Sequence, residues 1–176
     1  AVFVDRRIGG AEDAGAAAVV IQLDTPGGLV SSMRDIVADM QASTVPVTVW
    51  IGPSGARAGS AGAFIAAASD QLGMAPGTNI GSATPIGSGG EDLDAKVRND
   101  AAAFIAALAD ETGRNAESYR AMVTDALNLT AEQAVDQNVA ETIQPSVDAF
   151  VAWLDGRPGR NGPIATAGAP IETETL

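Results

Sequence analysis

Short runs of apolar residues alternate along the chain with longer stretches in which apolar side chains recur every three or four positions. Two runs, 18–24 and 45–51, are rich in Val and Ile, which is typical of strands buried in a parallel sheet. Shorter runs at 71–74 and 139–143 predict two further strands. The recurring pattern predicts amphipathic helices over 1–14, from Ser31 or Ser32 through Met40, over 60–69 and 94–112, and from Asn115, Thr130 and Ser146 onward. Strands that alternate with helices in this way predict an α/β domain with a largely parallel sheet.

Capping residues and glycines mark where these helices begin and end. The expected N-caps are Ser31 or Ser32, Asn115, Thr130 (which has capping-box spacing to Gln133) and Ser146, and the expected stops are Gly15, Gly113 and Gly156. The Gly-, Ser- and Pro-rich stretch 79–90 is predicted to be a loop. The chain after residue 156 is rich in Gly, Pro and Thr. We therefore predict a folded domain over 1–156 and a flexible tail or linker over 157–176.

Composition narrows the possible functions. The 176 residues include 10 basic and 22 acidic side chains, and the net charge of −12 argues against nucleic acid and anionic membrane surfaces as partners. The chain contains no His and no Cys, so it cannot form a Ser-His-Asp triad of its own or a thiolate metal site. We expect neither a metal nor a cofactor. No apolar run approaches the ~18 residues that a membrane-spanning helix needs.

The segment around Ser60 is the strongest candidate for chemistry. Small residues surround this serine, and an apolar helical run follows it. The neighbouring glycines, at 59 and 62, allow a sharp turn and a close approach of the backbone to a ligand. The first amides of the helix have no intrahelical partner and can face a developing negative charge. A hydroxyl at this point suits a nucleophile, although a tight turn before a core helix has the same pattern.

A serine nucleophile needs a group that removes its proton. Without His or Cys, the candidate bases are carboxylates and Lys96, which is the only lysine in the chain. An amine acts as a base when it is uncharged, and this requires an apolar site without a close carboxylate partner. Lys96 stands at the start of an apolar helix, and the loop before it can fold it over Ser60. Its alternative role is that of a solvated lysine at a helix start.

Backbone amides could complete the site as an oxyanion hole. The strand over 18–24 ends in a Thr-Pro-Gly-Gly turn, and the N–H groups of Gly28 and of Ala61 are the candidate donors. Ligands bind at the carboxyl ends of the strands in open parallel sheets. The turn at Gly27 and Gly28 and the turn at Ser60 both follow strands, so they are expected to line one site. A Pro-Gly-Gly turn alone also occurs as an ordinary connection.

Five blocks occur in one order along the chain. They are Leu23-Asp-Thr-Pro-Gly-Gly28, Ala56-Arg-Ala-Gly-Ser60-Ala-Gly62, Met74-Ala-Pro-Gly-Thr78-Asn-Ile-Gly81, Lys96, and Glu111-Thr-Gly-Arg-Asn115. With these blocks the chain resembles, over roughly residues 5–155, the N-terminal protease domain of the NfeD family, which are membrane-bound ClpP-class serine proteases. The resemblance implies a ClpP/crotonase-like fold and a Ser-Lys dyad. It assigns Ser60 as nucleophile, Lys96 as base, and Gly28 and Ala61 as oxyanion donors.

The resemblance also implies a biological setting. It implies a homodimer on the extracytoplasmic side of a membrane, membrane helices that this chain does not contain, and stomatin-like proteins cleaved in hydrophobic segments. The substrate is expected to lie extended along the segment from Gly27 to Leu29, as in strand addition. The chain departs from the family pattern in two ways. The strand that usually precedes the first helix is absent, so either the sheet is expected to lack a member or the chain is trimmed at its N-terminus. The loop over 85–95 is short and glycine-rich. The resemblance implies that this loop can be mobile, so Lys96 is expected to reach its place only with substrate or a partner.

Two functions of other kinds fit the same residues. A crotonase-like acyl-CoA enzyme would use the oxyanion hole without a serine nucleophile and would tolerate Ser60→Ala. A non-catalytic scaffold that binds stomatin-like partners would not react with serine-directed probes. A nucleotide-binding domain is disfavoured, because the glycines at 55, 59 and 62 do not form G-x-G-x-x-G and no G-x-x-x-x-G-K-[ST] occurs. Thr78 and Ser82 are the candidate hydroxyls for orienting Lys96.

Overall fold

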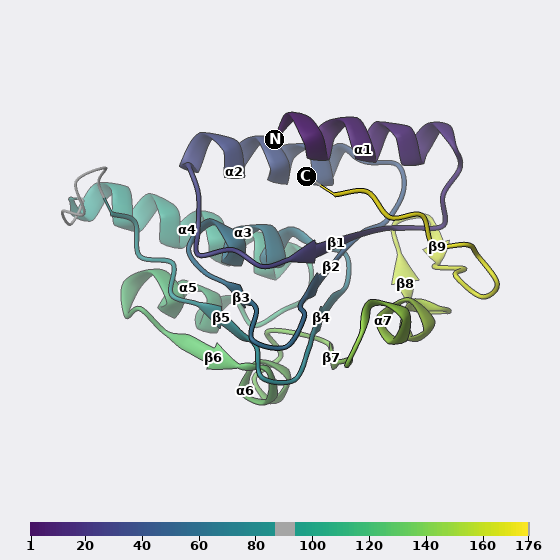
Figure 1. The fold of residues 1–176 in the computed structure, drawn as a ribbon. Helices are drawn as coiled ribbons and strands as arrows, with labels where there is room; N and C mark the ends of the chain where they lie inside the picture. Colours follow the sequence, from purple (N-terminus) through teal and green to yellow (C-terminus); the bar gives the residue numbers. More distant parts are fainter. Residues whose placement is uncertain (87–93, 176) are drawn as a thin grey trace.

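A computed structural model describes residues 1–86 and 94–175 (Figure 1). Helices and strands alternate as the apolar pattern predicts. In chain order the elements are α1 (Val2–Asp13), β1 (Val19–Leu23), α2 (Val30–Ala42), β2 (Val47–Ile51), β3 (Arg57–Ala58), α3 (Ala61–Ala68), β4 (Leu72–Met74), β5 (Asn79–Gly81), α4 (Ala95–Glu111), α5 (Ala116–Thr124), β6 (Asn128–Thr130), α6 (Ala131–Asp136), β7 (Thr142–Ile143), α7 (Val147–Leu154), β8 (Pro158–Gly159) and β9 (Gly162–Pro163).

The central sheet has the strand order β1-β2-β4-β7, and all of its pairs are parallel. Every residue of β2 is buried, because apolar side chains cover both faces of this strand. Val49 packs into the large core under helices α1 to α5, whereas Trp50 faces a smaller core that includes Phe150 of α7. The predicted parallel α/β architecture is therefore confirmed.

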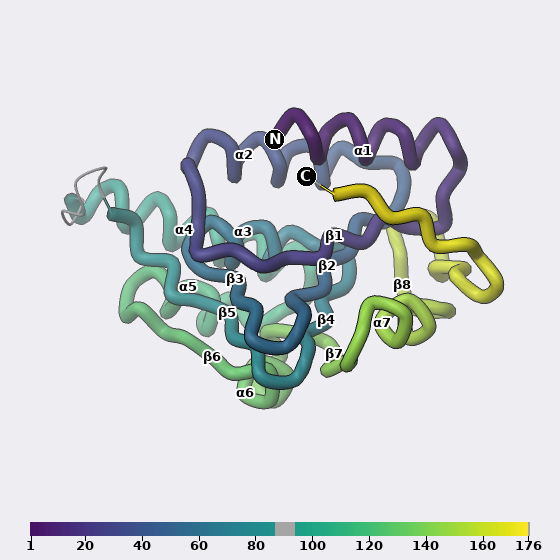
Figure 2. Tube along the Cα trace, viewed as in Figure 1, coloured from purple at the N-terminus to yellow at the C-terminus, as the bar shows by residue number. Residues whose placement is uncertain are grey.

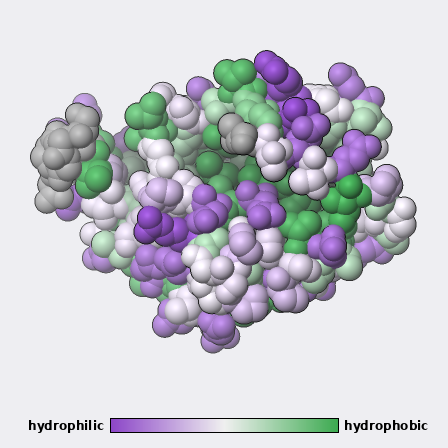
Figure 3. Space-filling view, viewed as in Figure 1, coloured by the Kyte–Doolittle hydropathy of each residue, from purple (hydrophilic) through white to green (hydrophobic). Residues whose placement is uncertain are grey.

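Strand β1 forms one edge of this sheet within the described residues. Its apolar residues Val19, Ile21 and Leu23 are only half-buried. Figure 3 shows apolar side chains gathered in a hollow below α1 and α2, where β1 lies in Figure 1. The absence of a further strand beside β1 stays a prediction.

A second, smaller sheet carries the chain around Ser60. Its order is β3-β5-β6, with β3 parallel to β5 and β5 antiparallel to β6. Residue Thr25, just after β1, makes an isolated parallel bridge to Ala58 of β3. The two sheets are thus joined at the point where both candidate turns begin.

Several local predictions are confirmed and others are wrong. Asn115, Ser146 and the Thr130–Gln133 capping box cap helices as predicted. Neither Ser31 nor Ser32 caps α2, because this helix begins earlier, with Leu29 as an N-cap that makes no side-chain hydrogen bond. The predicted loop over 79–90 begins with strand β5, and its residues from 87 lie outside the described part of the chain.

Residues 157–166 make defined contacts with the rest of the chain. Strands β8 and β9 form a small hairpin, the Arg160 guanidinium pairs with the Asp70 carboxylate at 2.9 Å, and Ile164 is buried. Figure 2 shows the chain then running back toward its own N-terminus, where Arg7 pairs with Glu174 at 3.3 Å. The division of domains after residue 156 stays a prediction. No helix among the described residues is long and apolar enough to cross a membrane.

A buried ion pair joins the C-terminal half of the domain to helix α3. The side chain of Arg114 is fully buried, and its guanidinium donates two hydrogen bonds to Glu141, at 2.8 and 2.9 Å. It also donates to the carbonyl oxygens of Ala67 and Ser69, at 3.2 and 2.8 Å. One side chain therefore fixes the end of α3, the turn before α5 and the start of β7.

Replacing Arg114 by Ala should lower the free energy of unfolding by about 3–5 kcal/mol, because Glu141 and the two carbonyls lose their buried partner. Arg120→Ala is the matched control, since Arg120 is exposed and lies 3.6 Å from the Glu117 carboxylate. Exposed pairs of this kind contribute about 1 kcal/mol or less. Urea denaturation of the three proteins measures the difference. Equal losses in both variants would contradict the structural role given to Arg114.

Candidate active site

Ser60 stands at a sharp turn between strand β3 and helix α3. It is the N-cap residue of α3, with φ 50° and ψ −114°, a positive φ that non-glycine residues rarely adopt. Its N–H donates to the carbonyl of Ser82 at 2.7 Å, and its carbonyl accepts from Ala63 at 3.0 Å. A strained strand-turn-helix connection of this kind exposes a serine hydroxyl and places the next amide beside it.

The turn after β1 lies directly against this serine. Gly27 has φ 140°, and a Cβ added to it would lie 2.9 Å from Ser60 Cβ and 3.3 Å from Ser60 Oγ. A Cβ added to Gly59 would lie 3.0 Å from the Pro26 carbonyl oxygen. Glycine at both positions lets the two backbones approach this closely. The prediction that the two turns line one site is confirmed.

A cavity of about 470 Å³ opens over Ser60. Its described lining residues are Pro26, Gly27, Gly28, Ser60, Ser82, Thr84, Ile86 and Ala126. None of these side chains carries a charge, so this part of the lining supplies no base for the serine. Thr84, Ile86 and Ala126 come from loops distant in sequence from Ser60, and no local pattern pointed to them.

Two backbone amides beside Ser60 have no protein acceptor among the described residues. They are the N–H groups of Gly28, which is exposed, and of Ala61, which is nearly buried in the first turn of α3. Both residues were predicted as oxyanion donors. Among the lining residues Ile86 is 64% exposed, so an apolar side chain borders the opening. Leu29, which follows Gly28 in the chain, is 73% exposed and is not part of the described lining.

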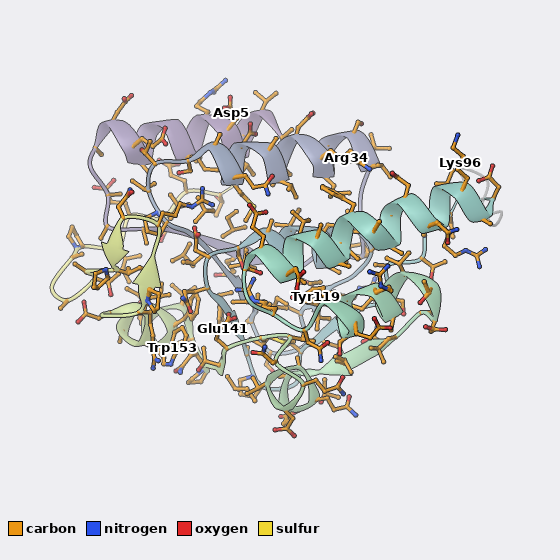
Figure 4. All side chains as sticks on the ribbon, turned by 180° about the vertical axis from the view of Figure 1, so that it is seen from behind. Asp5, Arg34, Lys96, Tyr119, Glu141 and Trp153 are labelled. Atoms are coloured by element: carbon orange, nitrogen blue, oxygen red, sulfur yellow. The ribbon has the colours of Figure 1, made fainter. Side chains whose placement is uncertain are left out.

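Lys96 is not brought to the serine in this structure. It is exposed in the first turn of α4 and does not line the cavity, and Figure 4 shows it at the outer end of that helix. Residues 87–93, which cover most of the loop predicted to deliver it, lie outside the described part of the chain. Thr78 is buried and donates to the Ala75 carbonyl at 2.6 Å, whereas Ser82 does line the cavity.

A second hollow in the described part of the chain offers a weaker case for chemistry. A hollow of about 630 Å³ lies at the other ends of the strands, but its carboxylates Asp70 and Glu141 are already paired with Arg160 and Arg114. The described residues contain no group of three or more His, Cys, Asp or Glu side chains that could hold a metal ion. The candidate chemistry therefore centres on Ser60.

Comparison with known proteins shows the family of the chain. A family model described as the NfeD1b N-terminal domain matches residues 1–155. The chain belongs to the NfeD1b N-terminal domain family. It is 40% identical over 157 residues to the membrane-bound protease PH1510 of Pyrococcus horikoshii and 32% identical over 168 residues to the membrane protein NfeD1b of Bacillus subtilis. These matches cover 86% and 88% of this chain but only 36% and 38% of the relatives, so the chain spans little more than a third of their length.

Solved structures show the same family fold. A serine-to-alanine variant of the 1510-N membrane-bound stomatin-specific protease is 34% identical, with a TM-score of 0.92 over 98% of this chain and 89% of that one. A lysine-to-alanine variant of that protease, in complex with a substrate peptide, is 36% identical, with a TM-score of 0.85 over 94% and 76%. ClpP1 of Listeria monocytogenes, at 22% identity and a TM-score of 0.66 over 82% and 84%, shares the fold alone. The predicted ClpP-like fold is confirmed.

Proposed function

We propose that this NfeD-family domain is a serine endopeptidase in which Ser60 is the nucleophile and Lys96 the base. The observation that carries the proposal is the strained turn that holds Ser60 Oγ against Gly27. Beside it lie the amides of Gly28 and Ala61, for which the described residues offer no acceptor. Such an arrangement places a nucleophile and an oxyanion hole around one carbonyl group. The related structures add support, because their described variants replace a serine and a lysine of a protease.

The chemistry would proceed in two halves. Lys96, with its amine uncharged, takes the proton of Ser60 Oγ as the oxygen attacks the peptide carbonyl carbon, and the amides of Gly28 and Ala61 hold the oxyanion. The tetrahedral intermediate collapses, the C–N bond breaks, and the ammonium of Lys96 returns its proton to the leaving amine. Water then attacks the ester on Ser60 with the same base, which releases the acid and restores the serine.

Lys96 must move for this chemistry to occur, since it is exposed at the outer end of α4 and does not line the cavity. The charge-free lining favours an uncharged amine there, because burial away from carboxylates destabilises the ammonium form. We therefore propose that substrate or a partner brings the first turn of α4 toward Ser60 when the site is filled.

The surroundings of the site suit an apolar, extended substrate. Ile86 presents an exposed apolar side chain at the opening, and Leu29, next in the chain to the lining residue Gly28, is also exposed. The segment from Gly27 to Leu29 can pair with an extended peptide by strand addition. We propose a stomatin-like protein, cleaved in a hydrophobic segment, as the substrate. For the whole protein we propose a homodimer, with this domain on the extracytoplasmic side of a membrane.

A serine-reactive fluorophosphonate probe tests the nucleophile. The probe should label one residue, and peptide mapping by mass spectrometry should place the adduct on Ser60. Heat-unfolded protein is the control, because labelling must depend on the folded site. Binding of a stomatin-like partner without any labelling would instead favour a scaffold, and tight binding of CoA esters without labelling would favour an acyl-CoA enzyme.

A further inference from the structure

We infer that Thr25 is a positioning residue that aims the oxyanion amide of Gly28 at the carbonyl attacked by Ser60. This inference rests on the proposed peptidase function. Thr25 does not line the cavity, so it would act through the turn that follows it. Nothing in the apolar pattern of the sequence distinguishes this threonine from an ordinary turn residue.

The backbone of Thr25 joins the oxyanion turn to the nucleophile turn. Its N–H donates to the Arg57 carbonyl at 2.7 Å, and its carbonyl accepts from the Gly59 N–H at 3.0 Å. These bonds form the parallel bridge between Thr25 and Ala58. Gly27 follows Thr25 by two residues, and Ser60 follows Ala58 by two residues. Both turns therefore start from one hydrogen-bonded junction.

The hydroxyl of Thr25 holds the backbone of Gly27. Oγ1 accepts from the Gly27 N–H at 3.1 Å and donates to the Gly27 carbonyl oxygen at 3.0 Å. Glycine has the widest conformational freedom of any residue, so its orientation here must come from such contacts. The Gly27 carbonyl and the Gly28 N–H belong to one planar peptide unit and point in opposite directions when the unit is trans. Holding that oxygen consequently sets the direction of the Gly28 N–H.

The methyl group of Thr25 makes a packing contact that is separate from the hydrogen bonds of its hydroxyl. Its Cγ2 lies 2.7 Å from the position that a Cβ on Gly62 would occupy, in the first turn of α3. The methyl thus packs against the helix that begins after Ser60. Because the hydroxyl orients a peptide unit and the methyl fills space, two substitutions can separate the roles. Thr25→Val keeps the shape without the hydroxyl, and Thr25→Ser keeps the hydroxyl without the methyl.

Steady-state cleavage of an apolar peptide by the two variants tests the inference. Removing a whole oxyanion donor costs about 10²–10³ in kcat. A donor that is present but no longer held should cost less, so we expect Thr25→Val to lower kcat about 10- to 100-fold with KM nearly unchanged. Thr25→Ser should keep kcat within about 3-fold of wild type, even though its Tm falls because packing against α3 is lost.

A second readout does not depend on turnover. A peptide aldehyde that adds to Ser60 places an oxyanion in the hole, so Thr25→Val should weaken its binding by a factor similar to the loss in kcat. Binding of the uncleaved peptide, compared between Ser60→Ala and the Ser60→Ala, Thr25→Val double variant, should stay the same. The first ligand reports on the oxyanion hole and the second on ground-state binding.

Two results would overturn the inference. One is a Thr25→Val variant with the kcat and aldehyde affinity of wild type. The other is a pair of variants whose kcat losses simply follow their losses in Tm, which would show a purely structural role. Failure of the proposed function looks different, because either the wild-type domain would then not cleave the peptide or Ser60→Ala would cleave it as fast as wild type.

Discussion

Ser60→Ala should abolish cleavage of an apolar peptide, with a fall in kcat of about 10⁴-fold or more. The reason is that the attacking oxygen itself is removed, while the oxyanion amides of Gly28 and Ala61 stay in place. Steady-state kinetics on purified protein, at a substrate concentration well above KM, measures the loss. The affinity of the variant for the uncleaved peptide should stay close to the KM of wild type, provided that chemistry is the slow step.

The matched control for this experiment is Ser54→Ala. Ser54 is an exposed serine in the connection between β2 and β3, outside the residues that line the cavity. Its replacement should leave kcat within about 2-fold of wild type, because surface substitutions of this kind rarely change stability by more than about 0.5 kcal/mol. Cleavage by Ser60→Ala at a rate near that of wild type would remove the nucleophile from the mechanism.

Lys96→Ala should lower kcat by about 10²–10⁴-fold, the usual contribution of a general base. Lys96→Arg should lower kcat to a similar extent although it keeps the positive charge, because a guanidinium does not lose its proton in proteins. The pair of variants therefore separates base catalysis from simple charge effects. Added small primary amines should restore part of the activity of Lys96→Ala and none of the activity of Ser60→Ala.

Arg98→Ala is the control for these lysine variants, since it removes a positive charge from the same end of α4. It should keep kcat close to that of wild type. A Lys96→Arg variant with nearly full activity would show that charge suffices at this position. The base would then have to be sought elsewhere, starting with the carboxylates near the turn, such as Asp24, which now accepts a hydrogen bond from the Arg57 N–H at 3.1 Å.

The parts of the fold that the sequence predicts correctly are those whose cause is local. Strand β2 follows from a run of apolar residues that only burial on both faces can satisfy. The caps at Asn115 and Ser146 follow from side-chain oxygens placed beside free amides. The approach of Gly27 to Ser60 follows from glycines placed after two strands of one α/β domain, as the rule for ligand sites in such domains predicts.

Other features of the structure depend on residues far apart in the sequence or on where an element begins. The segment after residue 156 has a composition that favours disorder, but Arg160 finds its partner in Asp70, 90 positions earlier. Helix α2 begins at Val30, with the extended residue Leu29 as its N-cap, so Ser31 and Ser32 lie inside the helix and neither caps it. Ser82 lies next to Ser60 because its carbonyl accepts from the Ser60 N–H, and its hydroxyl donates to the Ala126 carbonyl.

The dyad itself is the part that sequence and structure describe differently. The family motif assigns Lys96 as the partner of Ser60, yet the lysine is exposed and outside the described cavity lining. No spacing rule can say whether a helix start lies over a cavity or away from it, because that depends on what fills the cavity. Occupied and empty forms of the site are therefore expected to differ in the first turn of α4.

A crystal structure of the domain with a peptide aldehyde bound would decide this point. We predict a tetrahedral adduct on Ser60 Oγ, with its oxyanion about 2.7–3.1 Å from the amide nitrogens of Gly28 and Ala61. We further predict that Lys96 Nζ lies about 2.6–3.2 Å from Ser60 Oγ. A complete adduct on Ser60 with Lys96 still exposed at the outer end of α4 would contradict the Ser-Lys mechanism.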